Sequence, residues 1–193
     1  EIITQSYFTK TNFITNDSYN YKEFAAPQWH VTIDHSTGIR FKGCNFKNLN
    51  TQTPVDYTGP DNKWGGGGIY AINSQVNVDQ YCTGFNLNCT NPTPSIFENL
   101  REGISVKGTL KNRKLNCLHS EFINNATNGI SIISQNYCSI ISNNFSYVTP
   151  NPYEYATQSG LYQIGTLISL STGYRVEENT YSGNSNGSWS QAG

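Results

Sequence analysis

The chain has 193 residues, with 12 Lys and Arg against 13 Asp and Glu, and a formal net charge of −1. Charged residues make up only 13% of it, which is about half of their usual share in globular proteins. A protein that binds nucleic acid by neutralising phosphates needs a strongly positive field, so this function is not expected. The sequence also contains no apolar run of the length that a membrane-spanning helix requires.

Uncharged polar and aromatic residues dominate the composition. Asn, Ser, Thr and Gly together account for 80 of the 193 residues, and 13 Tyr, 9 Phe and 3 Trp provide apolar surface. The 17 Ile outnumber Ala and Leu combined. Since β-branched and aromatic residues favour strands whereas Ala and Leu favour helices, the composition predicts an all-β protein.

Short strands are predicted along most of the chain, and they form a degenerate repeat. One element is a Gly or polar turn followed by an alternating strand. The other is an aromatic residue that has apolar residues seven and five positions before it and a small or amide residue two before it. In chain order, the predicted elements are 31–33, 39–48, 68–71, 95–99, 103–106, 115–124, 129–132, 138–145, 165–170 and 174–181.

A repeat of this length built from short strands is typical of a solenoid, in which each unit buries its apolar side only against its neighbours. Equivalent side chains should then stack in one continuous core. The residues expected in that core are Ile104, Cys117, Phe122, Ile130, Ile140 and Phe145. Gly and Asn at recurring positions suit the turns, and stacked Asn side chains can hydrogen-bond along the stack.

The Gly-Ile-x-[Val/Ile] strand followed by the aromatic unit resembles the right-handed parallel β-helix repeats of the pectin-lyase-like superfamily, of the kind found in exported bacterial surface proteins. The resemblance covers roughly residues 28–182 in about five coils. It implies a single β-helix segment over 1–193, part of a longer chain, with 183–193 as a linker or frayed end. A β-sandwich is the competing all-β fold, but it does not explain an aromatic residue at a fixed offset.

The superfamily includes polysaccharide lyases and hydrolases, phage tailspikes and non-catalytic surface proteins, so the fold does not select a function. The stretch Ile33-Asp34-His35 is similar to one in pectate lyases, but the accompanying arginine motif and further acidic residues are missing. His119, next to Ser120 and Glu121, shows no catalytic spacing. We therefore expect no catalytic residues, no metal site and no cofactor, and we interpret Asp34 as a turn residue that bonds local amides.

The five cysteines show no metal-binding spacing. Cys82 and Cys89 lie in one polar segment, and we predict a disulfide between them. Cys44, Cys117 and Cys138 fall in apolar strand patterns, which predicts buried thiols.

Three insertions, at 50–66, 79–94 and 148–160, interrupt the repeat. Insertions in a solenoid tend to leave from one side, and exposed aromatic rings among amides and acids suit sugar rings. The four glycines at 65–68 are interpreted as residues that let a loop pack closely on the coil, rather than as a phosphate-binding site. The predicted glycan-contact residues are Asp56, Tyr57, Asp61, Trp64, Tyr81, Tyr153, Glu154 and Tyr155.

The sequence therefore favours a non-enzymatic, secreted or cell-surface β-helix segment that serves as a stalk or passenger and binds carbohydrate through its loops. Its other partners would be flanking domains of the parent protein. A divergent polysaccharide lyase or glycoside hydrolase fragment is the first alternative, and a phage tailspike-like module is the second.

Overall fold

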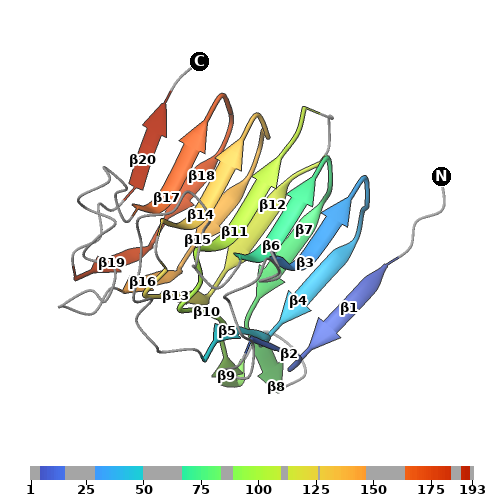
Figure 1. Cartoon of the computed structure of the whole chain (residues 1–193), viewed down its shortest axis with the longest axis vertical. Helices are drawn as coiled ribbons and strands as arrows, with labels where there is room; N and C mark the ends of the chain where they lie inside the picture. The colour runs from blue at the N-terminus through green and yellow to red at the C-terminus, as the bar shows by residue number, and fades with distance from the viewer. Residues whose placement is uncertain are drawn as a thin grey trace, which may run out of the picture.

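The computed structural model describes residues 5–15, 29–49, 67–83, 89–109, 113–125, 127–146, 164–183 and 188–191. All regular structure in these residues is β-strand. The strands form three six-stranded sheets, A, B and C, in which all neighbours are parallel, and one separate antiparallel pair (Figure 1).

Each large sheet collects strands from distant parts of the sequence. Sheet A contains β1 (Ser6–Thr9), β4 (Ile39–Lys42), β7 (Val76–Asp79), β12 (Leu115–Leu118), β15 (Ser139–Ile141) and β18 (Arg175–Glu177). Sheet B contains β2 (Asn12–Thr15), β5 (Asn45–Asn48), β10 (Ser95–Glu98), β13 (Ser120–Ile123), β16 (Asn144–Ser146) and β19 (Thr180–Ser182). Sheet C contains β3 (Trp29–Asp34), β6 (Gly67–Ile72), β11 (Glu102–Lys107), β14 (Asn128–Ile133), β17 (Ile164–Ser169) and β20 (Ser188–Gln191).

The chain visits the sheets in the order C, A, B and then returns to C. Strands β11, β12 and β13 make one such round, and β14, β15 and β16 make the next. Within each sheet the rounds pair in register, so that Ile104 lies beside Ile130 and Phe97 beside Phe122. This arrangement is consistent with a solenoid, and the predicted repeat strands coincide with strands of the structure.

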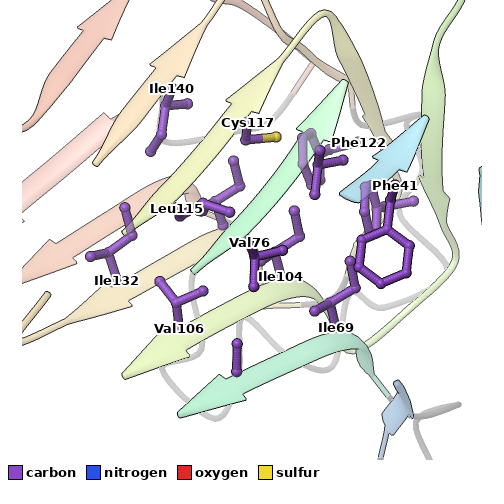
Figure 2. Packing of buried hydrophobic residues seen from close by; sticks show 14 of the residues in the cluster. Phe41, Ile69, Val76, Ile104, Val106, Leu115, Cys117, Phe122, Ile132 and Ile140 are labelled. Atoms are coloured by element: carbon purple, nitrogen blue, oxygen red, sulfur yellow. The ribbon is translucent and has the colours of Figure 1, made fainter. Parts of the chain in front are cut away.

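The core lies between the three sheets, because alternate residues of strands such as β4, β7 and β12 are buried. All six residues predicted for the core are fully buried. Figure 2 shows Ile104 and Ile132 from sheet C, Cys117 and Ile140 from sheet A, and Phe122 from sheet B projecting into the same interior.

Sheet B contributes an unbroken row of stacked aromatic rings. Centroids are 4.6 Å apart from Phe13 to Phe46, 4.7 Å from Phe46 to Phe97, 4.9 Å from Phe97 to Phe122, 4.7 Å from Phe122 to Phe145 and 4.9 Å from Phe145 to Tyr181. Neighbouring ring planes deviate by 12° at most. The spacing matches the distance between parallel strands, so in-register pairing is sufficient to produce the row.

Glycines of sheet C face this row. A Cβ atom on Gly68 would lie 2.8 Å from Cδ1 of Phe97, and a Cβ on Gly129 would lie 2.6 Å from Cδ1 of Phe145. His30 occupies the equivalent position on β3, since its neighbours Trp29 and Val31 pair with Gly67 and Ile69. Its ring lies 6.4 Å from that of Phe46. Two glycines of segment 65–68, Gly67 and Gly68, belong to strand β6, where they pack against the side chains of Trp29 and Phe97.

A second row, of small and amide side chains, lies where sheet A meets sheet B. Asn143 Nδ2 donates to the carbonyl of Cys117 and its Oδ1 accepts from the amide of Ser120, both at 3.0 Å. Asn179 Oδ1 accepts from the backbone amide of Asn143 at 2.9 Å and from its side chain at 3.0 Å. The predicted hydrogen bonding between stacked asparagines is therefore confirmed at this corner.

Residues in the left-handed region follow many of the strands. In the corner between sheets C and A, they are His35, Asn73, Ser134 and Leu170, with φ between 46° and 54°. The backbone amides of His35, Asn73 and Ser134 bond the neighbouring round, as that of His35 does to the carbonyl of Ile72 at 3.0 Å. The sequence predicted Gly and Asn for such turns, but backbone hydrogen bonds hold other residue types in the same conformation.

The repeat extends further than 28–182. Strands β1 and β2 pair with β4 and β5, and Phe13 begins the aromatic row. At the other end, β20 pairs with β17 within the segment that the sequence predicted as a linker.

Candidate functional site

The outer face of sheet A carries a groove of about 360 Å³. It runs across β4, β7, β12 and β15, and outward-pointing side chains line it. We call it the sheet A groove, and its outward-pointing residues are Arg40, Lys42, Asn77, Asp79, Asn116, Leu118, Ser139 and Ile141.

The groove has a cationic end and an amide centre. Arg40 and Lys42 are exposed on β4, and the guanidinium carbon of Arg40 lies 5.6 Å from the ring centre of Tyr7 on β1. On the next strands, Asn116 Nδ2 donates to Asn77 Oδ1 at 2.8 Å. The single acid, Asp79, is already engaged. Its Oδ1 lies 3.0 Å from His119 Nδ1 and accepts from the amide of Gln80 at 2.8 Å.

The outer face of sheet C carries a different group of side chains. Trp29 stacks on Tyr70 with centroids 5.1 Å apart, and Lys107 Nζ lies 5.5 Å from the centre of the same tyrosine ring. A Cβ on Gly67 would lie 2.0 Å from the Trp29 ring, so glycine is required for this stack. The result is a partly exposed aromatic surface next to a cation.

Glu102 lies on β11 of the same sheet. Its Oε1 accepts from Asn128 Nδ2 at 3.2 Å. Burial raises the pKa of the Glu102 carboxyl, although the hydrogen bond from Asn128 and the charge of Arg101 oppose that shift. A half-buried acid with one amide partner can accept hydrogen bonds from a ligand, but proton transfer to a substrate would need a second positioned group.

Most of the sequence-predicted glycan contacts lie outside the described residues: Asp56, Tyr57, Asp61, Trp64, Tyr153, Glu154 and Tyr155. Tyr81 is described. It lies on β8 (Tyr81–Thr83), where Lys10 Nζ is 4.3 Å from its ring centre and its Cβ packs on Gly43. Lys10 of the first round therefore contacts the Tyr81 ring, while the residue stays partly exposed.

The insertions do not leave from equivalent corners, in contrast to the expectation from sequence. Residues 50–66 and 147–163 connect sheet B to sheet C, between β5 and β6 and between β16 and β17. Residues 80–94 connect β7 of sheet A to β10 of sheet B instead. They contain the antiparallel pair of β8 and β9 (Thr90–Thr93), which lies beside β5 and β2 in Figure 1.

Cys82 and Cys89 form a disulfide across this hairpin, with Cα atoms 5.1 Å apart. Cys44, Cys117 and Cys138 are free and buried. Burial raises the pKa of Cys117 to about 12 and that of Cys138 to about 11, because the thiolate would lose its hydration. These three thiols are core residues with suppressed reactivity.

The histidine motifs of the sequence lie in turns. His35 Nδ1 is 2.6 Å from Asp34 Oδ1, and both side chains are exposed. The partner of Asp34 is therefore an imidazole rather than the backbone amides that we expected. His119 contacts Asp79 of the preceding round rather than Ser120 or Glu121. Within the part of the chain that the structure describes, no three His, Cys, Asp or Glu side chains group together as metal ligands would.

No protein-family model, curated protein or solved structure matches this chain. The described strands and turns include no helix with the length and apolar character needed to cross a bilayer. Sequence reasoning missed the sheet A groove, because its residues lie on outward-facing positions that follow no repeat. A comparison of the outward-facing positions in the aligned repeat strands could have revealed it.

Proposed function

We propose that this chain is a segment of right-handed parallel β-helix of the pectin-lyase-like kind and serves as a structural element of a secreted or cell-surface protein. The unbroken row of rings from Phe13 to Tyr181, faced by glycines, carries this proposal. In such a row each ring packs on the next, from one end of the segment to the other. An extended stalk or passenger requires a continuous core of this kind.

The disulfide supports the location. Cys82 and Cys89 are both exposed at the hairpin. An exposed disulfide persists in an oxidising environment and is reduced in most cytosols. Burial protects the other three cysteines from oxidation, so they would remain thiols after export.

The buried polar side chains support a structural role as well. Asn125 accepts from the amide of Leu100 at 3.2 Å and donates to the carbonyl of Phe97 at 3.1 Å, and Ser95 accepts from the amide of Cys44 at 3.2 Å. Each joins two rounds. These buried side chains therefore use their hydrogen bonds to hold the rounds together.

Removal of one complete round tests the structural proposal. Deleting residues 102–127 joins Arg101 to Asn128, which occupies the register position of Glu102. In a solenoid, β14 then pairs with β6, and the shortened chain retains parallel-sheet circular dichroism and cooperative unfolding. Deleting only 102–109 removes β11 alone and should prevent folding. Equal loss of structure in both deletions would contradict the proposal.

Glycan binding at the outer face of sheet C is a second candidate function. The stacked Trp29 and Tyr70 favour it, since an exposed aromatic surface suits the C–H face of a sugar ring. The insertions that hold Trp64 and Tyr155 connect to this sheet. Trp29→Ala should then weaken binding of neutral and acidic oligosaccharides on a glycan array, whereas Tyr137→Ala at an exposed corner should not.

Two assays separate the alternative functions. Release of unsaturated uronate products or reducing ends from polysaccharides would assign the chain to a lyase or hydrolase and overturn the non-enzymatic proposal. A trimer in light scattering would favour a tailspike-like module. We expect no turnover and no trimer.

A further inference from the structure

We propose that the sheet A groove binds an anionic saccharide. This site goes beyond the proposed structural role, and it lies on a different sheet from Trp29 and Tyr70.

The charged side chains of the sheet A groove favour an anionic ligand. Arg40 and Lys42 give the groove two positive charges against the one negative charge of Asp79, in a chain whose net charge is −1. Asp79 is also held by His119 and by the amide of Gln80. The Tyr7 ring lies next to the Arg40 guanidinium, and this contact limits the orientations of the arginine side chain. A guanidinium binds the two oxygens of a carboxylate or sulfate in parallel.

The amides provide partners for sugar hydroxyls. The hydrogen bond from Asn116 to Asn77 uses one polar atom of each side chain. The Nδ2 of Asn77 can therefore donate to a hydroxyl oxygen, and the Oδ1 of Asn116 can accept from a hydroxyl hydrogen. Ser139, on the next strand, adds a group that does both. Such closely spaced donors and acceptors suit a ligand with several hydroxyls better than a simple anion.

An apolar pair completes the groove. Leu118 and Ile141 are register partners on the outer face of β12 and β15, and both are partly exposed. They lie beside the Asn116 and Ser139 positions, so a sugar ring can place its C–H face on them while its hydroxyls meet the polar row. Because the polar row crosses four strands, at intervals of about 4.8 Å, a linear chain of sugars fits it better than a single sugar.

Titration of the full chain with defined oligosaccharides tests this site. The probes are a glucuronate oligomer, a sulfated galactose oligomer, and the methyl-esterified, uncharged form of the first. We expect saturable binding of at least one anionic probe by calorimetry, with backbone NMR shifts concentrated on β4, β7 and β12. The methyl ester should bind at least about tenfold more weakly, since each tenfold change is about 1.4 kcal/mol, a typical value for a charged hydrogen bond.

Matched variants locate the binding. Arg40→Gln with Lys42→Gln should lower affinity for the anionic probe by about tenfold or more, and Asn116→Ala should lower it less. Arg101→Gln removes one exposed charge outside the groove and serves as the control. All three variants alter exposed or half-exposed side chains, and unchanged circular dichroism verifies their folding.

Four results would overturn the proposal: no saturable binding of either anionic probe, equal loss of affinity with Arg101→Gln, inorganic sulfate competing as well as the oligomer, or a polyglutamate peptide binding as tightly with the same dependence on Arg40. The first two exclude the site, and the last two replace the sugar by a simple anion or an acidic peptide. None of them bears on the deletion test of the solenoid.

Discussion

Gly103 lies directly against the ring of Phe122, which belongs to the same round of the chain. A Cβ atom on Gly103 would be 2.8 Å from Cδ1 and 2.9 Å from Cε1 of that ring. It would also be 2.5 Å from the carbonyl oxygen of Gly129 on the next strand. The glycine of each repeat and the aromatic residue that follows it are therefore one packing unit.

The first prediction follows from this contact. Gly103→Ala should lower the free energy of unfolding by about 1–3 kcal/mol, the usual cost of overpacking a core. Urea unfolding measures the change. Phe122→Leu should relieve part of the penalty of Gly103→Ala in a double-mutant cycle. Strict additivity of the two changes would show that the side chains do not share this space.

Phe122 itself should be among the most sensitive positions. Phe122→Ala removes a fully buried ring that is stacked on both sides, and we expect a loss of about 3–5 kcal/mol. Tyr137→Ala, at a side chain that is 67% exposed, should change stability by less than about 0.5 kcal/mol. Equal effects of the two substitutions would contradict the core assignment.

Adjacent asparagines give a third prediction. Asn143→Ala leaves the amide of Ser120 and the carbonyl of Cys117 without their side-chain partner in a buried place. We expect a loss of at least about 1–3 kcal/mol. Asn144→Ala changes an exposed position on the outer face of sheet B and is the matched control, with an effect near zero. Denaturant midpoints of the two variants provide the comparison.

The fourth prediction concerns alkaline pH. Below the ordinary thiol pKa of 9.0, Cys117 is protonated in the folded and the unfolded state. Above it, the unfolded thiol ionises, whereas the folded thiol keeps its proton until about pH 12. The folded state then binds more protons, so this group lowers stability as pH rises. Cys117→Ala should show a smaller decline above pH 9 than the unchanged protein.

His30 gives the opposite sign at acidic pH. Burial lowers the pKa of His30 from 6.5 to about 4, so between these values the unfolded state binds the extra proton. Stability should fall as pH decreases through this window. His30→Gln should lose less stability between pH 6.5 and 4 than the unchanged chain. Parallel curves for His30→Gln and the unchanged chain would disprove the assignment.

The sequence predicted the interior of this molecule better than its surface. Phe122, Ile130 and Cys117 recur at fixed offsets because each must pack on its counterpart in the next round, and this constraint makes the repeat visible. Asn143 and Asn179 recur for the same reason. Outer-face residues such as Arg40 and Asn77 take no part in the packing of the core, so no repeat identifies them.

Connections were the other source of difference. The sequence pattern treated the segments after Asn48 and after Asp79 as equivalent insertions, but β5 leads from sheet B to sheet C and β7 from sheet A to sheet B. Which sheet a strand joins depends on pairing with distant rounds, which local patterns do not contain. Strands β1 and β2 were missed because Ser6 stands seven residues before Phe13, where the repeat pattern requires an apolar residue.

The hairpin of β8 and β9 interrupts one round between β7 and β10, yet Val78 still pairs with Cys117 and Phe97 still pairs with Phe122. A corner of this fold therefore accepts extra residues without disturbing the strands on either side, since a longer connection costs little entropy once its ends are fixed. Evolution, or an engineer, can change what such a corner displays while the sheets beneath it stay the same. A foreign peptide grafted between Cys82 and Cys89 would be presented on a closed loop at a defined height along the sheets.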